Sequence, residues 1–138
     1  MKTSAALLGS LTIPGRPERV AQARAFVAQA LGDHRTSADT AVLLTSELVT
    51  NSLQHSDSGR DGGTITITLI AIPGGIRAEV IDEGGATVPA LYPGPPGSPE
   101  LTDSGRGLQL VDTLAARWSY SRDEAGTVTW FELDLPLL

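Results

Sequence analysis

The feature that most constrains the fold is a pair of alternating segments near the middle of the chain. Residues 64–72 read TITITLIAI, so threonine alternates with isoleucine or leucine over most of this stretch. Successive side chains of a strand point to opposite faces, which gathers the apolar side chains of this segment on one face. Residues 73–75 read PGG and form a turn, and residues 76–81 supply the returning strand. The segment therefore predicts a β-hairpin.

Further strands are predicted on both sides of this hairpin. Their expected bounds are residues 7–13, 117–122 and 127–135. Trp118 and Trp130 belong to the last two of these strands. We expect both tryptophans to be core residues of a sheet packed on helices.

Two helices are expected before the hairpin. Pro17 suits the first position of a helix, and apolar residues then recur at helical spacing until Gly32 ends it. Thr36 and Asp39 fit a capping box at the start of the second helix. That helix should end near Ser56, because the residues that follow have the composition of a loop.

The second helix carries a row of polar side chains. Glu47, Asn51 and His55 stand four apart, so they lie on one side of the helix, while leucine and valine residues widen an apolar surface. A carboxylate can act as a general base, and an amide oxygen is a suitable ligand for Mg²⁺. A solvated polar face is the alternative interpretation of the same pattern, and these residues alone leave both open.

An acidic residue and a glycine follow the second strand of the hairpin, at Asp82 and Gly84. Such a pair is common in simple turns. It also suits ligand binding, because a carboxylate at a strand end can hydrogen-bond the edge of a flat ligand. The glycine would let that ligand approach the backbone closely.

A proline-rich loop is expected at residues 85–104, and it ends in a glycine motif, SGRGL, at residues 104–108. Long loops in compact domains are usually functional or disordered, and the flanking glycine motifs favour a lid over a plain insertion. Apolar residues continue at helical spacing after the motif, so its glycines open a helix. Free N–H groups and the helix dipole would then favour phosphate. The motif lacks the lysine and hydroxyl residue of a P-loop.

Composition limits the functions to be considered. The chain has 138 residues, which suits a single domain over residues 1–138. Its net charge of −6 argues against nucleic acid or an anionic membrane as the main partner. It has no cysteine, which excludes disulfides and thiolate catalysis. No apolar stretch approaches the roughly 20 residues of a membrane span, and no clear signal-peptide cleavage site follows the short apolar start, so we expect a cytoplasmic protein.

Four motifs stand in a fixed order along the chain: ELVTNSLQH at residues 47–55, VIDEG at 80–84, SGRGLQLV at 104–111 and GTV at 126–128. This order resembles the GHKL ATPase superfamily, also called the Bergerat fold. It most resembles the small anti-sigma-factor serine/threonine kinases among the histidine-kinase-like ATPases. The resemblance implies an α/β (α+β) two-layer sandwich with a mixed, largely antiparallel sheet, helices on one face, and ATP between the helices and the lid.

The resemblance also implies a role for each matching residue. Asn51 would hold Mg²⁺ on the phosphates of ATP, and Glu47 would be the general base. Asp82 would accept a hydrogen bond from the adenine amino group, and Gly84 would leave room for the ring. Thr127 would support Asp82 and the adenine through its hydroxyl group.

The glycine motif would contact the phosphates. Gly105 and Gly107 would give backbone amides, and Leu108 completes this nucleotide-binding segment. Arg106 either reaches a phosphate or faces solvent, and the sequence favours neither. For His55, a structural hydrogen bond and a ligand contact are equally open.

Three functions are weighed on this basis. In the first, the protein phosphorylates a serine or threonine of an anti-anti-sigma partner with a STAS domain and sequesters a sigma factor in its other state. In the second, a nucleotide is bound without turnover and gates the affinity for a protein partner. The third, an interaction domain without nucleotide, requires the motif order to be coincidence. The resemblance alone suggests a homodimer.

Overall fold

The structure is a computed structural model that describes residues 5–32, 35–60, 62–84 and 103–135. Its elements are, in chain order, β1 (Ala6–Pro14), the short 3-10 helix η1 (Pro17–Arg19), α1 (Val20–Leu31), α2 (Arg35–His55), the short 3-10 helix η2 (Asp57–Gly59), β2 (Thr64–Ile72), β3 (Gly75–Asp82), α3 (Asp103–Leu114), β4 (Arg117–Asp123) and β5 (Gly126–Asp134). All the predicted strands and helices are present, and the central hairpin is formed by β2 and β3.

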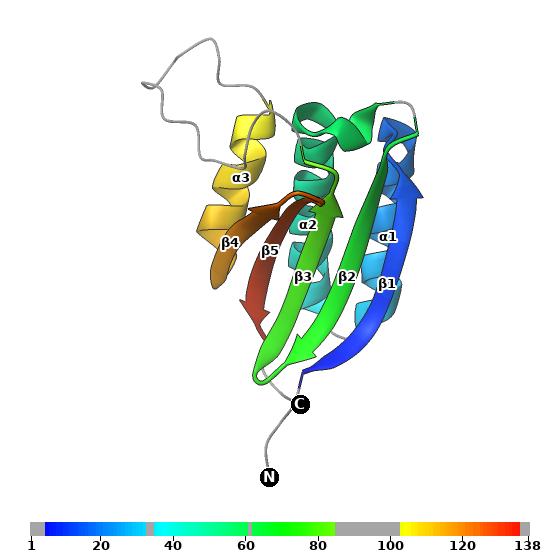
Figure 1. The fold of residues 1–138 in the computed structure, drawn as a ribbon. Coiled ribbons are helices and arrows are strands. Elements are labelled where there is room, and N and C mark those ends of the chain that lie inside the picture. Colours follow the sequence, from blue (N-terminus) through cyan, green and yellow to red (C-terminus); the bar gives the residue numbers. More distant parts are fainter. Residues whose placement is uncertain (1–4, 33–34, 61, 85–102, 136–138) are drawn as a thin grey trace.

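The strands form one five-stranded sheet in the order β1-β2-β3-β5-β4. Every neighbouring pair in this sheet is antiparallel. The helices α1, α2 and α3 lie on one face of the sheet, and no described helix lies on the other, which we call the uncovered face (Figure 1). The predicted α+β sandwich is therefore confirmed, and its sheet is antiparallel throughout the described strands.

The hydrophobic core lies between the sheet and the helices. Alternate residues of the inner strands point into it, including the predicted apolar row of β2 and the fully buried Phe131 of β5. Helix α2 contacts both α1 and α3 and buries Leu44 and Leu48. Because α2 is the middle helix, it lies over the central strands β3 and β5.

Two element boundaries differ from those expected. Helix α2 begins at Arg35, so Thr36 lies inside the helix and is not its N-cap, because a capping residue stands just outside the first helical residue. Helix α3 begins at Asp103, so the last two residues of the predicted lid are helical. The rest of that predicted lid, residues 85–102, lies outside the described part of the chain.

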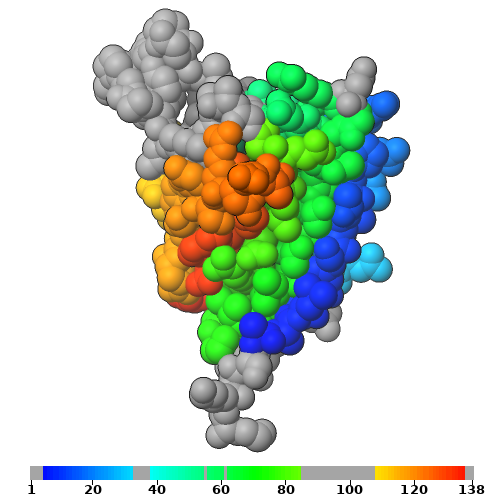
Figure 2. Space-filling view, in the orientation of Figure 1, coloured from blue at the N-terminus to red at the C-terminus, as the bar shows by residue number. Residues whose placement is uncertain are grey.

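The uncovered face of the sheet carries an ordered cluster of polar side chains around Trp130. The guanidinium of Arg77 lies 3.9 Å from the centroid of the Trp130 ring, which is the geometry of a cation–π contact. The same guanidinium donates hydrogen bonds to Glu79 at 2.9 Å and to Glu132 at 3.1 Å. Figure 2 views the molecule onto this face, with β1, β2 and β3 side by side in blue to light green.

The prediction that both tryptophans are core residues is wrong for Trp130. Side chains alternate along β5, so Trp130 and its neighbour Phe131 point to opposite faces, and Phe131 takes the core position. Trp118 packs half-buried against the core, and its indole N–H donates to Asp112 Oδ1 at 2.9 Å.

Candidate functional site

The carboxylate of Asp82 is the best-fixed polar group of the predicted site. Asp82 is the last residue of β3, and only 7% of it is exposed. Its Oδ2 accepts a hydrogen bond from Ser52 Oγ at 2.6 Å, and its Oδ1 accepts one from the backbone N–H of Gly84 at 2.7 Å. A carboxylate has about four acceptor positions, so both oxygens keep the capacity to accept another donor.

Thr127 lies beside this carboxylate from the neighbouring strand. Thr127 of β5 is the register partner of Asp82, and it is 2% exposed. Gly84 has a φ of +76°, a conformation that favours glycine. A Cβ added to Gly84 would lie 3.8 Å from Thr127 Oγ1. The structure therefore brings together three residues for which the family resemblance implies a role in adenine recognition.

Gly126, which precedes Thr127, must be a glycine because the start of β5 passes very close to the backbone of Asp82. A Cβ at Gly126 would lie 1.9 Å from the backbone oxygen of Asp82, so no other residue fits without a shift of the backbone. The motif at residues 126–128 is thus explained locally: the glycine lets β5 reach the end of β3, and the threonine that follows lies next to the carboxylate.

The C-terminal part of helix α2 reaches the same end of the sheet. The hydrogen bond from Ser52 fixes the distance between α2 and the end of β3, and Asn51 is the preceding residue of the helix. Glu47 lies one turn earlier on the same side as Asn51, and both side chains are half-buried. The side chain of His55 lies outside the described part.

A turn after α2 fastens the helix to the Asp82–Gly84 segment. Ser58 Oγ accepts a hydrogen bond from the N–H of Glu83 at 2.8 Å, and the N–H of Asp57 donates to the carbonyl of Gly84. Ser58 is completely buried. The end of α2, the η2 turn and the end of β3 therefore form one connected unit.

Sequence reasoning missed Ser52 and Ser58. One signal for Ser52 was available: it continues the four-spaced row of Leu44 and Leu48, so it occupies a buried position of the helix. A hydroxyl group at such a position needs a buried partner. No comparable signal pointed to Ser58, because its partner lies 25 residues further along the chain.

The glycine motif lies at the start of α3. Gly105 and Gly107 lie in the first two turns of the described part of this helix. Leu108 is 3% exposed and belongs to the hydrophobic core. The side chain of Arg106 lies outside the described part.

The sequence profile of the histidine kinase-like ATPase domain matches residues 13–133, which is most of the chain. The chain belongs to the histidine kinase-like ATPase family. The matched region of this ATPase-family protein contains every motif described above, and membership of the family implies that ATP is its ligand.

Two known proteins are similar to this chain, one in sequence and one in fold. The uncharacterized protein SCO4941 of Streptomyces coelicolor is 37% identical over 73 residues, which are 52% of this chain and 64% of that protein. The crystal structure of the RsbU and RsbW domains of Rv1364c from Mycobacterium tuberculosis aligns with a TM-score of 0.62 at 21% identity. That alignment covers 92% of this ATPase-family chain and 32% of the other chain, and it establishes a shared fold. Among the described helices, none is long and apolar enough to cross a membrane.

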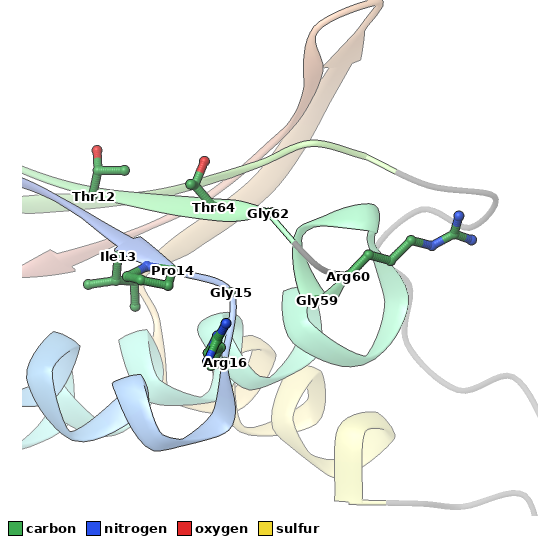
Figure 3. A pocket seen from close by; sticks show the side chains of 10 residues that line it. Thr12, Ile13, Pro14, Gly15, Arg16, Gly59, Arg60, Gly62 and Thr64 are labelled. Atoms are coloured by element: carbon green, nitrogen blue, oxygen red, sulfur yellow. The ribbon is translucent and has the colours of Figure 1, made fainter.

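A separate cavity of about 350 Å³ lies at the β1 side of the η2 turn in this ATPase-family protein. Its lining residues are Thr12, Ile13, Pro14, Gly15, Arg16, Gly59, Arg60, Gly62, Gly63 and Thr64 (Figure 3). None of the predicted site residues lines it. The cavity shares the η2 turn with the Asp82 site, but the two are lined by different residues.

Proposed function

We propose that this protein is a regulator that binds Mg·ATP at the end of β3, between α2 and α3. The observation that carries the proposal is the Asp82 carboxylate, which is buried, held by two donors and still able to accept a hydrogen bond. Adenine presents an amino group as a donor, and the backbone of Gly84 offers a surface without a side chain. Thr127 of β5 supports the adenine ring.

Helix α2 would bind the phosphates of ATP through Mg²⁺. The side-chain oxygen of Asn51 is the expected Mg²⁺ ligand, and the bound ion would neutralise phosphate charge. The backbone N–H groups of Gly105 and Gly107 and the positive end of the α3 dipole would favour a phosphate at this end of α3. Arg106 completes this phosphate-binding segment, and Leu108 anchors the segment in the hydrophobic core.

The reaction that we propose is phosphorylation of a serine or threonine on a STAS-domain anti-anti-sigma partner. The carboxylate of Glu47 accepts the proton of that hydroxyl group as its oxygen attacks the γ-phosphorus. The bond to the β,γ-bridging oxygen breaks, and ADP leaves. We further propose that the protein sequesters a sigma factor. We also propose that it acts as a single domain over residues 1–138, that it forms a homodimer and that it works in the cytoplasm.

A calorimetric titration with ATP, with and without Mg²⁺, tests the nucleotide site. We expect Mg²⁺-dependent binding to the wild type and weaker, less Mg²⁺-dependent binding to Asn51→Ala. Gln54→Ala is the matched control, because Gln54 is exposed on the same helix. Equal binding by wild type and Asn51→Ala, or no binding at all, would contradict the proposed site.

A transfer assay with labelled ATP tests the reaction. Label on a serine of a STAS-domain partner, lost in Glu47→Ala although ATP still binds, is the expected result. Tight ATP binding with the γ-phosphate unchanged, in the presence of sigma factor and STAS partners, would replace the kinase by a nucleotide-gated binding module.

A further inference from the structure

The hydroxyl group of Ser52 occupies an unusual position for a helix side chain. It follows Leu44 and Leu48 on the buried side of α2, and only 3% of Ser52 is exposed. Its Oγ lies 2.6 Å from Oδ2 of Asp82, a distance typical of a charge-assisted hydrogen bond. Burial of a hydroxyl group is unfavourable unless it is hydrogen-bonded. Here the partner is the carboxylate of Asp82, which we propose binds the adenine ring.

We infer that Ser52 is a positioning residue that makes the site selective for purines with an amino group at position 6. This inference rests on the proposed function. Ser52 and the N–H of Gly84 hold opposite oxygens of Asp82, so the plane of the carboxylate is fixed between two donors. The remaining acceptor positions are thereby directed at a fixed point.

The chemistry of the two donors explains the selectivity. The Ser52 proton and the Gly84 proton are both given to Asp82, so neither is available to a ligand. A 6-amino group donates to the carboxylate. An oxo group at position 6 presents an acceptor to the carboxylate, and the neighbouring N1–H of such a purine can reach Asp82 only if the ring shifts. Without that shift both acceptors stay unpaired, which is disfavoured.

Removal of the hydroxyl group should weaken this discrimination. In Ser52→Ala, Asp82 keeps one donor, and the carboxylate is free to rotate about its last side-chain bond. The variant leaves Asp82, Gly84 and Thr127 in place, so it removes the orientation of the acceptor and not the acceptor itself.

The test is a calorimetric comparison of ATP with inosine triphosphate, which carries oxygen at position 6. We expect the wild type to prefer ATP, and Ser52→Ala to lose about tenfold in ATP affinity, with the affinity for inosine triphosphate changed less than twofold. Ser46→Ala is the matched control: its hydroxyl group donates to the carbonyl of Leu43 at 2.8 Å on the same helix, and we expect both affinities to be unchanged.

Two further results decide the interpretation. Ser52→Thr retains a hydroxyl group and should restore the preference for ATP. If thermal unfolding shows that the added methyl group prevents folding, Ser52→Cys, a weaker donor, should have an intermediate preference. Equal loss of both affinities in Ser52→Ala, at an unchanged ratio, would overturn the inference and leave Ser52 a structural residue.

The affinities of the wild type for ATP and for inosine triphosphate distinguish a failure of this inference from a failure of the proposed function. Binding of ATP and inosine triphosphate with equal affinity would overturn the selectivity and leave the nucleotide site standing. Binding of neither nucleotide would overturn both.

Discussion

Ser58 Oγ accepts a hydrogen bond from the N–H of Glu83 at 2.8 Å, and this joins the turn after α2 to the end of β3. The bond is partly buried and Ser58 itself is fully buried, so Ser58→Ala leaves the Glu83 N–H without this partner. We expect a loss of about 1–3 kcal/mol in the free energy of unfolding and weaker ATP binding, measured by urea unfolding and calorimetry. Ser10→Ala, which removes an exposed contact to Thr68, should stay within about 0.5 kcal/mol. Equal effects of the two variants would exclude this role for Ser58.

The same turn is packed tightly against the end of β1. A Cβ at Gly15 would lie 1.6 Å from the carbonyl oxygen of Ser58, so Gly15→Ala forces the backbone apart. We expect a loss of about 1–3 kcal/mol or more in the free energy of unfolding. Gly74→Ala provides the contrast, because Gly74 has a φ of +77° and nothing within 4 Å of an added Cβ. Its cost should be about 1–2 kcal/mol, from backbone conformation alone. A Gly15→Ala protein as stable as the wild type would contradict the packing described.

Adjacent aromatic residues of β5 should differ in their effect on stability. Phe131 is fully buried between the sheet and the helices, so Phe131→Ala should cost about 3–5 kcal/mol through lost burial and the cavity left behind. Trp130→Ala, on the uncovered face beside Arg77, should cost clearly less. Chemical unfolding of the two variants provides the comparison, and the reverse order would contradict the assignment of the two faces.

The dependence of stability on pH should report the ion pairs of the uncovered face. The Arg117 guanidinium, which donates to Glu132 Oε1 at 2.7 Å, lowers the pKa of Glu132; burial opposes this effect, and Arg77 adds to it. A carboxyl group whose pKa is lower in the folded state stabilises the fold above its ordinary value of 4.5, and this contribution is lost as the pH falls further.

The measurement is the Tm of wild type and Glu132→Gln between pH 7 and pH 3. The wild type should unfold at the higher temperature at pH 7, and the difference should shrink as the pH falls below the ordinary value. Glu124→Gln, in the exposed turn between β4 and β5, is the control. A difference between wild type and Glu132→Gln that is constant with pH would exclude the ion pairs as its cause.

Replacement of Glu47 should separate transfer from binding. Without the general base, Glu47→Gln should lower the rate of phosphoryl transfer by about 10²–10⁴-fold, while the Kd for ATP changes little. Single-turnover transfer and calorimetry measure the two quantities. Loss of binding and transfer together would argue against Glu47 as the base.

The sequence was sufficient for the parts of this fold that depend on local patterns. The alternation at residues 64–72 predicts β2 and the face that its isoleucines bury, and the four-residue spacing places Glu47 and Asn51 on one side of α2. The contact between Ser52 and Asp82 was not predicted, because it joins residues 30 apart and depends on the position of a helix over a strand end. Trp130 was assigned to the wrong face because its size suggested burial, whereas strand alternation gives that position to Phe131.

The position of β5 in the sheet affects how the protein is made. It comes after all the other described strands in the chain, yet it lies between β3 and β4. Until the ribosome has released residues 126–134, β3 has an unpaired edge, and Asp82 lacks Thr127 as its neighbour. A nascent chain therefore cannot assemble the adenine-binding end of the site before β5 emerges, and nucleotide binding would report that β5 has joined the sheet.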